Sequence, residues 1–438
     1  MLNTTEPQLD GFTGAIITPD APDYDAAART PLVVSRPALL LRPRDVADVQ
    51  RGVHAAAATG LPVAVRGGGH SFAGLGTVDG GVVIDLSLLD SVEVLDGDRV
   101  RIGGGATWGG VVEALAPHSL VISSGDTASV GVGGLTLSGG IGWMVRAHGL
   151  TLDRLVSAQV VTAGGEIITA DREHHPDLFW ALRGGGGGLG VVTAFVLRAE
   201  PLPSITFGTL AFPADEAAQV VAGWAAYLGE APRELTSMVK LSNPFAGGVD
   251  APVEVTVAAI GNEAASLIEP LRSLGTLQSD SVRPQPYGDI LEEGNELPPG
   301  LRLAVRNGFV PPEAVDAAVA EVTAIAASPQ PAAIVLTSLG GAVADIGAEE
   351  TAFAHRRAQL MVTTFSGGPA PAFDSILAGI DAVWARLVPH IEGAYANFLD
   401  GTSPEAEASV HPEGTLRRLA GIRSGYDPAA LFTRKATA

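Results

Sequence analysis

The chain has 438 residues, of which 55 are glycine and none is cysteine, and 27 basic against 48 acidic side chains give a formal charge of −21. This length predicts two or three domains, and the negative charge excludes most nucleic-acid partners because it repels phosphate backbones. The absence of cysteine excludes disulfides and thiolate chemistry and favours a cytoplasmic location. The first residues, Met1–Glu6, show no signal-peptide pattern, and no apolar run is long enough to predict a membrane span.

The first 120 residues are expected to form a mixed α/β lobe that follows an N-terminal arm, residues 1–35. Pro43 predicts the start of a helix that runs to about residue 58, because Val46, Val49 and Val53 follow helical spacing. A second helix is expected over 108–115. Short apolar runs predict strands at 39–41, 61–65, 82–84, 92–94 and 100–102.

The segment Arg66-Gly67-Gly68-Gly69-His70-Ser71 directly follows one of these strands. Consecutive glycines let the backbone turn its N–H groups toward an anion without interference from Cβ atoms. The motif therefore predicts a phosphate-binding nest with a histidine beside it. A tight turn that ends in a surface histidine is the alternative.

A second glycine-rich block covers residues 124–143, with apolar residues between its glycines. Such a backbone is expected to pass close to a flat, partly apolar group, and an isoalloxazine ring with its diphosphate fits this requirement. The alternative is a buried crossing of two glycine-rich strands. The apolar part of the block, residues 130–145, is expected to form loop and strand.

A third block contains a G-x-G-x-x-G match at Gly185, Gly187 and Gly190. A nicotinamide-binding fold needs a strand before this motif and a helix after it. Here residues 175–182 are helix-like and residues 191–197 alternate like a strand, so the order is reversed. The motif is therefore not expected to bind a nicotinamide dinucleotide.

The middle of the chain is expected to form an α+β domain in which helices cover one sheet. Strand-like and helix-like runs alternate there. The strands are expected at 205–212, 237–242, 253–260 and 333–338, and the helices at 214–228, 262–274, 312–326 and 373–387.

Together these blocks resemble the FAD-linked oxidases of the vanillyl-alcohol oxidase and p-cresol methylhydroxylase superfamily, in particular the berberine-bridge-enzyme-like branch. The resemblance covers residues 36–197 and returns at 395–398 and 426–432. It implies an α+β protein with a two-lobed FAD-binding domain of the p-cresol methylhydroxylase type and a substrate domain with an antiparallel sheet covered by helices. The implied divisions are an arm (1–35), an FAD-binding domain (36–205), a substrate-binding domain (206–390) and a C-terminal segment that returns to the FAD domain (391–438).

The resemblance implies that FAD is bound covalently through His70. Bicovalent members carry a cysteine where this chain has Thr127, so a second, cysteinyl link is not expected. Val130 matches the small residue beside the oxygen approach in oxidases, which favours O2 as the acceptor. The implied cofactor-binding residues are His70, Arg66, Gly67, Gly68, Gly69, Ser71, Ser129, Val130, Gly131, Gly134, Gly140, Gly142, Val192 and Asn397.

Tyr395 and His355 are the candidate catalytic residues that the resemblance suggests. Tyr395 is the first candidate for the group that takes the substrate's proton, with packing against the cofactor as the alternative. His355 is expected to touch the substrate or stabilise reduced flavin, with a partly exposed structural role as the alternative. Asp153 is an isolated carboxylate for which a solvated surface position is expected. No metal site is expected, because His174 and His175 lack partners at ligand spacing.

The sequence thus predicts an FAD-dependent oxidase that oxidises a C–OH or C–N centre of a small organic molecule and reduces O2 to H2O2. The alternatives are a dehydrogenase of the same fold with another acceptor and a flavin-carrying protein without turnover. The expected partners are the small-molecule substrate and O2, with no nucleic acid and no membrane, and the chain is expected to be a monomer or a homodimer.

Overall fold

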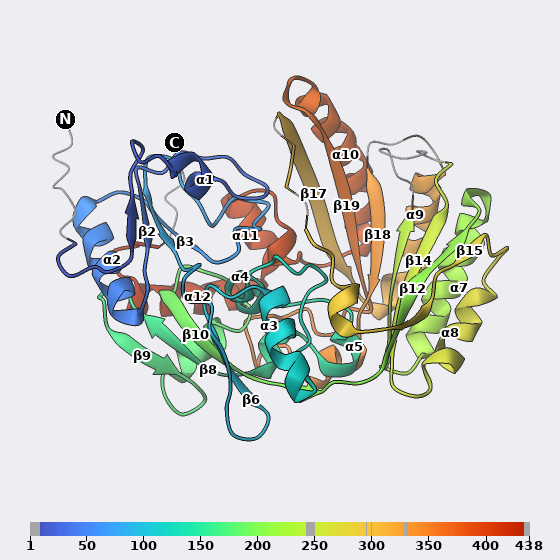
Figure 1. The fold of residues 1–438 in the computed structure, drawn as a ribbon. Coiled ribbons are helices and arrows are strands. Elements are labelled where there is room, and N and C mark those ends of the chain that lie inside the picture. The colour runs from blue at the N-terminus through green and yellow to red at the C-terminus, as the bar shows by residue number, and fades with distance from the viewer. Residues whose placement is uncertain are drawn as a thin grey trace.

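The computed structural model describes residues 9–241, 250–294, 296–298, 300–327, 329 and 332–432. The expectations for Met1–Glu6, for residue 242 of one expected strand and for residues 433–438 of the C-terminal segment lie outside the described residues. Figure 1 shows two halves: the N-terminal part of the chain lies on the left, and one large sheet with its helices lies on the right.

The first sheet has the strand order β1-β2-β4-β3, in which β2, β4 and β3 are parallel. Its strands are β1 (Ala15–Ile17), β2 (Leu39–Arg42), β3 (Val63–Arg66) and β4 (Val82–Asp85). Helix α2 (Val46–Thr59) connects β2 to β3, and its Val49 and Val53 are fully buried. The helix begins at Val46 and not at Pro43, because the Asp45 side chain accepts a hydrogen bond from Asp48 N and caps it.

The second sheet is antiparallel, with the order β5-β6-β10-β8-β9. Its strands are β5 (Val92–Val94), β6 (Arg99–Gly103), β8 (Leu155–Val161), β9 (Ile167–Ala170) and β10 (Val191–Arg198). The C-terminal helix α12 (Glu413–Tyr426) buries Leu419 and Ile422 in the same core. The last part of the chain therefore packs against a sheet formed by its first half.

In the described part of the chain, six more α-helices and one strand pair belong to this half. They are α1 (Tyr24–Ala28), α3 (Trp108–Leu115), α4 (Val132–Ser138), α5 (Val145–His148), α6 (Pro176–Ala181), α11 (Pro404–Val410), and the pair β7 (Leu120–Val121) and β11 (Glu200–Pro201). The expectation of loop and strand over 130–145 was wrong for residues 132–138, which form α4, whereas residues 139–144 form a loop. Burial of Val132 and Leu135 outweighs the low helix propensity of Gly133 and Gly134.

The third sheet is the large antiparallel sheet, with the order β15-β12-β14-β13-β18-β19-β17 and β16 paired to β12. Its strands are β12 (Ile205–Phe212), β13 (Leu235–Leu241), β14 (Val253–Ile260), β15 (Ser279–Asp280), β16 (Arg283–Gln285), β17 (Leu301–Val310), β18 (Ala333–Ser338) and β19 (Leu360–Pro369). The two longest, β17 and β19, pair along their whole length and were not predicted.

Four helices cover one face of this sheet and form its core: α7 (Ala217–Glu230), α8 (Ala264–Arg272), α9 (Val315–Ala326) and α10 (Phe373–Leu387) (Figure 1). The opposite face packs against the N-terminal half, where Phe309 and Met361 meet Val145 and Tyr395. This confirms the expected α+β fold with an antiparallel sheet covered by helices. The exact domain limits stay a prediction. Among the described residues, no helix is long and apolar enough to cross a membrane.

Candidate active site

Two glycine loops touch each other at the end of β3. A Cβ atom on Gly68 would collide with the backbone nitrogen of Gly131, and a Cβ on Gly131 would collide with that of Gly68. Gly69 also has a φ of 74°, a conformation that other residues rarely adopt. The predicted nest and the second glycine block therefore form one structure, in which the two backbones lie against each other.

His70 lies at this junction with Ser129 as its partner. The distance from His70 Nε2 to Ser129 Oγ is 2.9 Å, and the imidazole is half-buried. Burial lowers the pKa of His70, so the ring is neutral at physiological pH and has a nitrogen lone pair for bonding. The structure therefore brings His70, Gly67–Gly69 and Ser129–Gly131 together.

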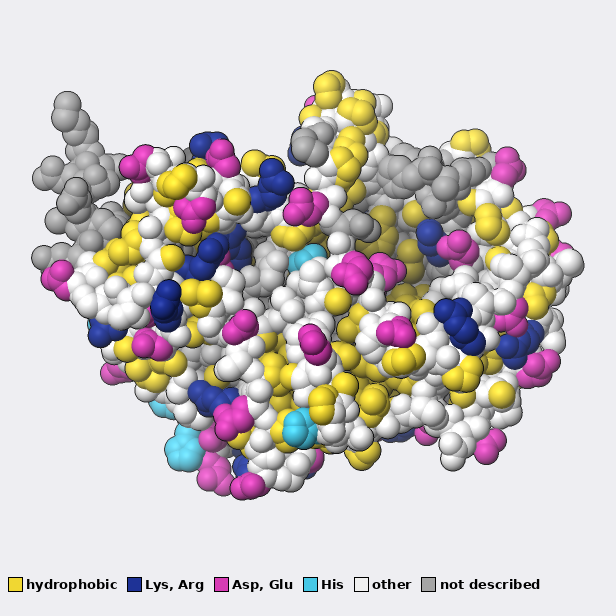
Figure 2. Space-filling view, viewed as in Figure 1, with side chains coloured by type: hydrophobic (Ala, Val, Ile, Leu, Met, Phe, Trp, Pro, Cys, Tyr) yellow, Lys and Arg dark blue, Asp and Glu magenta, His cyan; other side chains and the backbone are white. Residues whose placement is uncertain are grey.

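A segment from the other half covers this junction. Ala128 N donates to the carbonyl of Glu292, and Glu292 N donates to the carbonyl of Asp126, both at 2.7 Å. A Cβ on Gly294 would collide with Ser129 Oγ and would lie 3.4 Å from His70 Cε1. The segment after β16 is thus held to the loop that carries the predicted cofactor residues. Figure 2 shows a hollow between the two halves, with acidic side chains around it.

Arg66 and Ser71 are engaged with protein groups. The Arg66 guanidinium donates to Asp85 Oδ2 and to the carbonyl oxygens of Ala27 and Arg29, at 2.7–3.2 Å. These bonds fasten the N-terminal arm to β3. Ser71 Oγ accepts from Leu75 N at 3.1 Å. The role of both side chains in cofactor binding stays a prediction.

Tyr395 forms the centre of a second group of predicted residues. Its hydroxyl oxygen accepts from Gly140 N at 2.9 Å, from Ile141 N at 3.3 Å and from Asn397 Nδ2 at 2.9 Å. Burial raises the pKa of Tyr395, although these three donors act in the opposite direction. Tyr395 is therefore a neutral phenol at physiological pH. It precedes the short 3-10 helix η9 (Ala396–Phe398) and is not part of a strand.

The other predicted residues lie in the walls around these groups. A Cβ on Gly142 would collide with the Ser124 carbonyl, and one on Gly140 would collide with Thr151. Val192 is buried in the core of the second sheet. A Cβ on Gly134 would meet no atom within 4 Å, so this position borders open space. Gly140 and Gly142 thus let the loops pack closely, whereas Gly134 is the position of this group at which a bound molecule could approach the backbone.

His355 lies behind Tyr395 and not beside His70. Its ring stacks on Phe309 with centroids 4.9 Å apart, and Phe309 also contacts Tyr395 at 6.4 Å. His355 Nε2 lies 2.8 Å from the carbonyl oxygen of Val410, and burial lowers its pKa. The described contacts of His355 are thus with other residues of the chain. Its catalytic role stays a prediction.

The expectation that Asp153 is a solvated surface residue was wrong. Asp153 and Arg356 form a bidentate ion pair with two bonds of 2.8 Å, and their side chains are only 6% and 3% exposed. Asp153 also accepts from Leu150 N at 3.0 Å, so it fixes the turn behind the Tyr395 group. The only sequence signal for this pair was that Asp153 and Arg356 each lie in or next to a segment that resembles the family. Neither residue belongs to an apolar pattern from which burial could be predicted.

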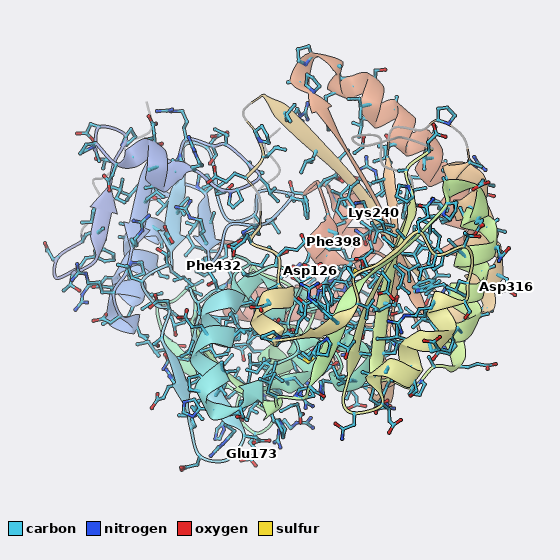
Figure 3. The ribbon with its side chains drawn as sticks, turned by 45° about the vertical axis from the view of Figure 1, so that its right-hand side comes forward. Asp126, Glu173, Lys240, Asp316, Phe398 and Phe432 are labelled. Atoms are coloured by element: carbon cyan, nitrogen blue, oxygen red, sulfur yellow. The ribbon has the colours of Figure 1, made fainter. Side chains whose placement is uncertain are left out.

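Sequence reasoning also missed two features of the hollow. Phe72, Phe365 and Phe398 form an aromatic triangle, with ring centroids 5.9–6.3 Å apart, that joins the His70 loop to β19 and η9. Asp126, next to Thr127, lies between the two halves, where Figure 3 labels it together with Phe398. The only sequence signal was that Phe72 follows His70, and Phe398 follows Tyr395, within the same motifs. The contacts themselves join residues that are far apart in the sequence, so no local pattern predicts them.

Comparisons with known proteins agree with this site. Residues 37–171 match the FAD binding domain family. An FAD-linked oxidoreductase of Dictyostelium discoideum is 30% identical over 91% of this chain and 88% of its own length. The chain belongs to the FAD-linked oxidoreductases.

Solved structures of this family share the whole fold. The crystal structure of 6-hydroxy-D-nicotine oxidase from Arthrobacter nicotinovorans matches with a TM-score of 0.85 and 27% identity, over 96% of both chains. A berberine-bridge-enzyme-like protein of Physcomitrella patens matches with a TM-score of 0.87 at 20% identity, over 97% of this chain and 96% of its own. The expected resemblance is therefore confirmed, and this FAD-linked oxidoreductase has the fold of p-cresol methylhydroxylase-type oxidases.

Proposed function

We propose that this FAD-linked oxidoreductase is an oxidase whose FAD is bound by one covalent bond to His70. In this proposal it oxidises a C–OH or C–N centre of a small organic molecule and passes the electrons to O2, which gives H2O2. The observation that carries the proposal is the neutral, half-buried His70 imidazole beside Ser129, at the contact of Gly68 with Gly131.

The residues present fit a singly attached flavin. Ser129 Oγ lies at His70 Nε2, and the described contacts give His70 Nδ1 no partner, so Nδ1 is the nitrogen proposed to bond the flavin 8α-carbon. Thr127 cannot form a thioether, and the sequence has no cysteine for a second bond. When bound, the flavin supplies a two-electron acceptor for the hydrogen that leaves the substrate carbon.

The substrate is proposed to lie in the hollow between the His70 loop and β19. The half-buried side chains of Phe72, Phe365 and Phe398 offer an apolar, aromatic surface there. The 6-hydroxy-D-nicotine oxidase named above acts, by its name, on a small nitrogen heterocycle. A small molecule with an apolar ring next to the reacting C–O or C–N bond is therefore the proposed substrate class.

Tyr395 and His355 are both proposed to contribute to catalysis, Tyr395 by binding the substrate and His355 indirectly. A neutral Tyr395 can hold a substrate oxygen or nitrogen by a hydrogen bond, whereas its raised pKa disfavours the phenolate that would accept a proton. His355 is proposed to act through the Phe309–Tyr395 packing that it supports. The acceptor of the proton is then another group.

The test of the tether is acid precipitation of the purified protein. The pigment is expected to precipitate with the wild-type chain and to appear in the supernatant for His70→Ala. His174→Ala, at an exposed position, is the matched control and is expected to keep the pigment bound. Pigment in the wild-type supernatant contradicts the covalent bond.

The test of the reaction is anaerobic reduction followed by air. Benzyl alcohol, benzylamine and cellobiose are the probes for alcohol, amine and sugar oxidation, and bleaching of the flavin identifies turnover. Rapid return of colour in air with formation of H2O2 is expected of an oxidase. Slow return indicates the alternative, a dehydrogenase with another acceptor, and bleaching by none of a broad panel indicates a flavin-carrying protein.

A further inference from the structure

Asp126 stands in the loop between β7 and α4, at the place where the two halves of the molecule meet. Its backbone carbonyl accepts from Glu292 N, and the next residue but one, Ala128, donates back to Glu292. Both bonds tie the Asp126 loop to the segment that follows the 3-10 helix η4 (Tyr287–Ile290). The backbone position of Asp126 is thus set by both halves, and its side chain is not needed for this bridge.

The Asp126 carboxylate receives hydrogen bonds only from its own neighbourhood in the chain. Thr127 Oγ1 donates to Oδ1 at 3.0 Å and the backbone N–H of Asp126 itself is the second donor, whereas no residue from another element in the described part of the chain donates to the carboxylate. The Asp126 side chain is half-buried. A carboxylate has about four acceptor sites, so these two donors leave it able to accept from a bound molecule.

The titratable groups that face Asp126 come from three elements. Its charge contributes, after burial, to the raised pKa values of Glu292, of Tyr287 on η4 and of Tyr395 before η9. Lys240 of β13 acts in the opposite direction on Glu292. The Asp126 charge therefore acts on groups from both halves of the molecule, the phenol of Tyr395 among them.

We infer that Asp126 is the catalytic base of this enzyme: its Oδ2 takes the proton from the substrate's O–H or N–H while the substrate carbon is oxidised. This inference rests on the proposed oxidase function. In the step, the O–H or N–H bond breaks and its proton bonds to the carboxylate. The C–H bond breaks as well, and that hydrogen leaves with two electrons to the flavin, the group that is reduced. The carbon becomes a carbonyl or imine.

The ionisation of Asp126 suits this role. Burial raises the pKa of its carboxyl above the ordinary value of 3.8, although the hydrogen bond from Thr127 lowers it. A carboxylate with a raised pKa is a stronger base than a surface aspartate. Its pKa is then closer to that of the hydroxyl or amine from which it would take the proton. A purely structural aspartate would be expected to have its charge satisfied by several donors, as Asp153 has by Arg356 and Leu150 N.

Asp126→Asn is the test, because it keeps the size of the side chain and the backbone bridge to Glu292. Glu293→Gln is the matched control, since it removes the same charge from an exposed neighbour of the bridge. Both holoenzymes are compared with the wild type by flavin content, by stopped-flow flavin reduction from pH 4 to 9 and by thermal unfolding from pH 3 to 9. The reductant is whichever of benzyl alcohol, benzylamine and cellobiose bleaches the wild-type flavin.

The expected result is a loss of about 100-fold or more in the rate constant of reduction for Asp126→Asn, with loss of the acidic limb of its pH profile. The unfolding comparison needs no substrate. The wild type loses stability as the pH rises through the raised pKa of Asp126, whereas the asparagine variant does not, so the Tm difference is expected to grow with pH in favour of the variant. Glu293→Gln is expected to behave like the wild type.

A rate that falls less than fivefold, or a Tm difference that does not change with pH, overturns the assignment. If none of the three probes bleaches the flavin, further alcohols, amines and sugars are screened until one does, because the unfolding comparison reports the burial of the carboxyl and not its part in the reaction. A wild-type protein that binds no flavin overturns the proposed function instead, so the two failures are distinguishable.

Discussion

Gly68 and Gly131 lie 63 positions apart in the sequence, yet their backbones touch so closely that neither residue has room for a Cβ atom. This contact joins the end of the first sheet to the start of α4 and places His70 beside Ser129. The predicted flavin site is therefore built around a backbone contact between two loops that are distant in the sequence.

Gly131→Ala is expected to separate the two loops. The extra methyl group requires a backbone shift, which is expected to lower the free energy of unfolding by about 1–3 kcal/mol and to abolish flavin binding. Urea unfolding and the absorbance of the purified protein measure both effects. Gly421→Ala is the control: in α12 its new methyl group would meet no atom within 4 Å, and it is expected to add about 0.5–1 kcal/mol. Normal flavin content in Gly131→Ala would contradict the role of the contact.

Asp153→Asn is expected to leave the Arg356 guanidinium charged and buried without its partner. Breaking a buried ion pair in this way costs about 3–5 kcal/mol, which chemical denaturation detects readily. Glu313→Gln removes the carboxylate from an exposed pair with Arg357, and it is expected to change the stability by less than about 1 kcal/mol. Equal effects of the two substitutions would show that burial does not distinguish these pairs.

His411 is expected to make the protein less stable in acid. Burial, followed by the charges of Arg423 and His355, lowers its pKa from 6.5 to about 4, and the structure gives its Nδ1 no hydrogen-bond partner. Because the unfolded chain binds a proton at a higher pH than the folded chain, the contribution of the neutral ring is complete above pH 6.5. This contribution is lost as the pH falls toward 4, and the free energy of unfolding decreases by about 3 kcal/mol in all.

The measurement is the unfolding free energy between pH 4 and 8 for the wild type and for His411→Asn. The variant is expected to show a smaller decrease toward pH 4, whereas His174→Asn, at an exposed position, is expected to match the wild type. A profile of His411→Asn with the same slope as that of the wild type contradicts the assignment of this acid sensitivity to His411.

Phe365→Ala is expected to weaken the binding of substrates with a ring. Phe365 forms the triangle with Phe72 and Phe398, and loss of its contact with a substrate ring is expected to cost about 0.5–1.5 kcal/mol beyond the lost area, or roughly 2- to 12-fold in KM. Benzylamine and butylamine are compared as probes. A KM increase for benzylamine alone supports the aromatic surface, and equal increases for both probes contradict it.

Much of the secondary structure could be predicted from apolar runs and helical spacing. The strands β12, β14 and β18 and the helices α3 and α10 have the expected bounds. By contrast, the edge strand β17 carries the charged residues Arg302 and Arg306 among its apolar residues. Its Asn307 is buried and bonds the backbone of Tyr395 and Phe398. Polar side chains on an edge interrupt the apolar pattern from which strands are predicted.

The glycine motifs identified the cofactor loops, but the partners within the site could not be found this way. The charge of Asp126 acts on the pKa values of Tyr287, Glu292 and Tyr395, and these three residues come from distant parts of the chain. The pairing of Asp153 with Arg356 likewise spans 203 positions. Local patterns contain no information about such contacts, because they form only when the two halves pack together.

The most direct test of the account is where the flavin is found after the protein is denatured and digested. The wild-type protein is precipitated with acid, cleaved with a protease and separated, and the fluorescent fraction is sequenced. The account predicts that the fluorescence stays with one peptide, which contains His70. Flavin that is free of peptide, or attached to a peptide without His70, would contradict it.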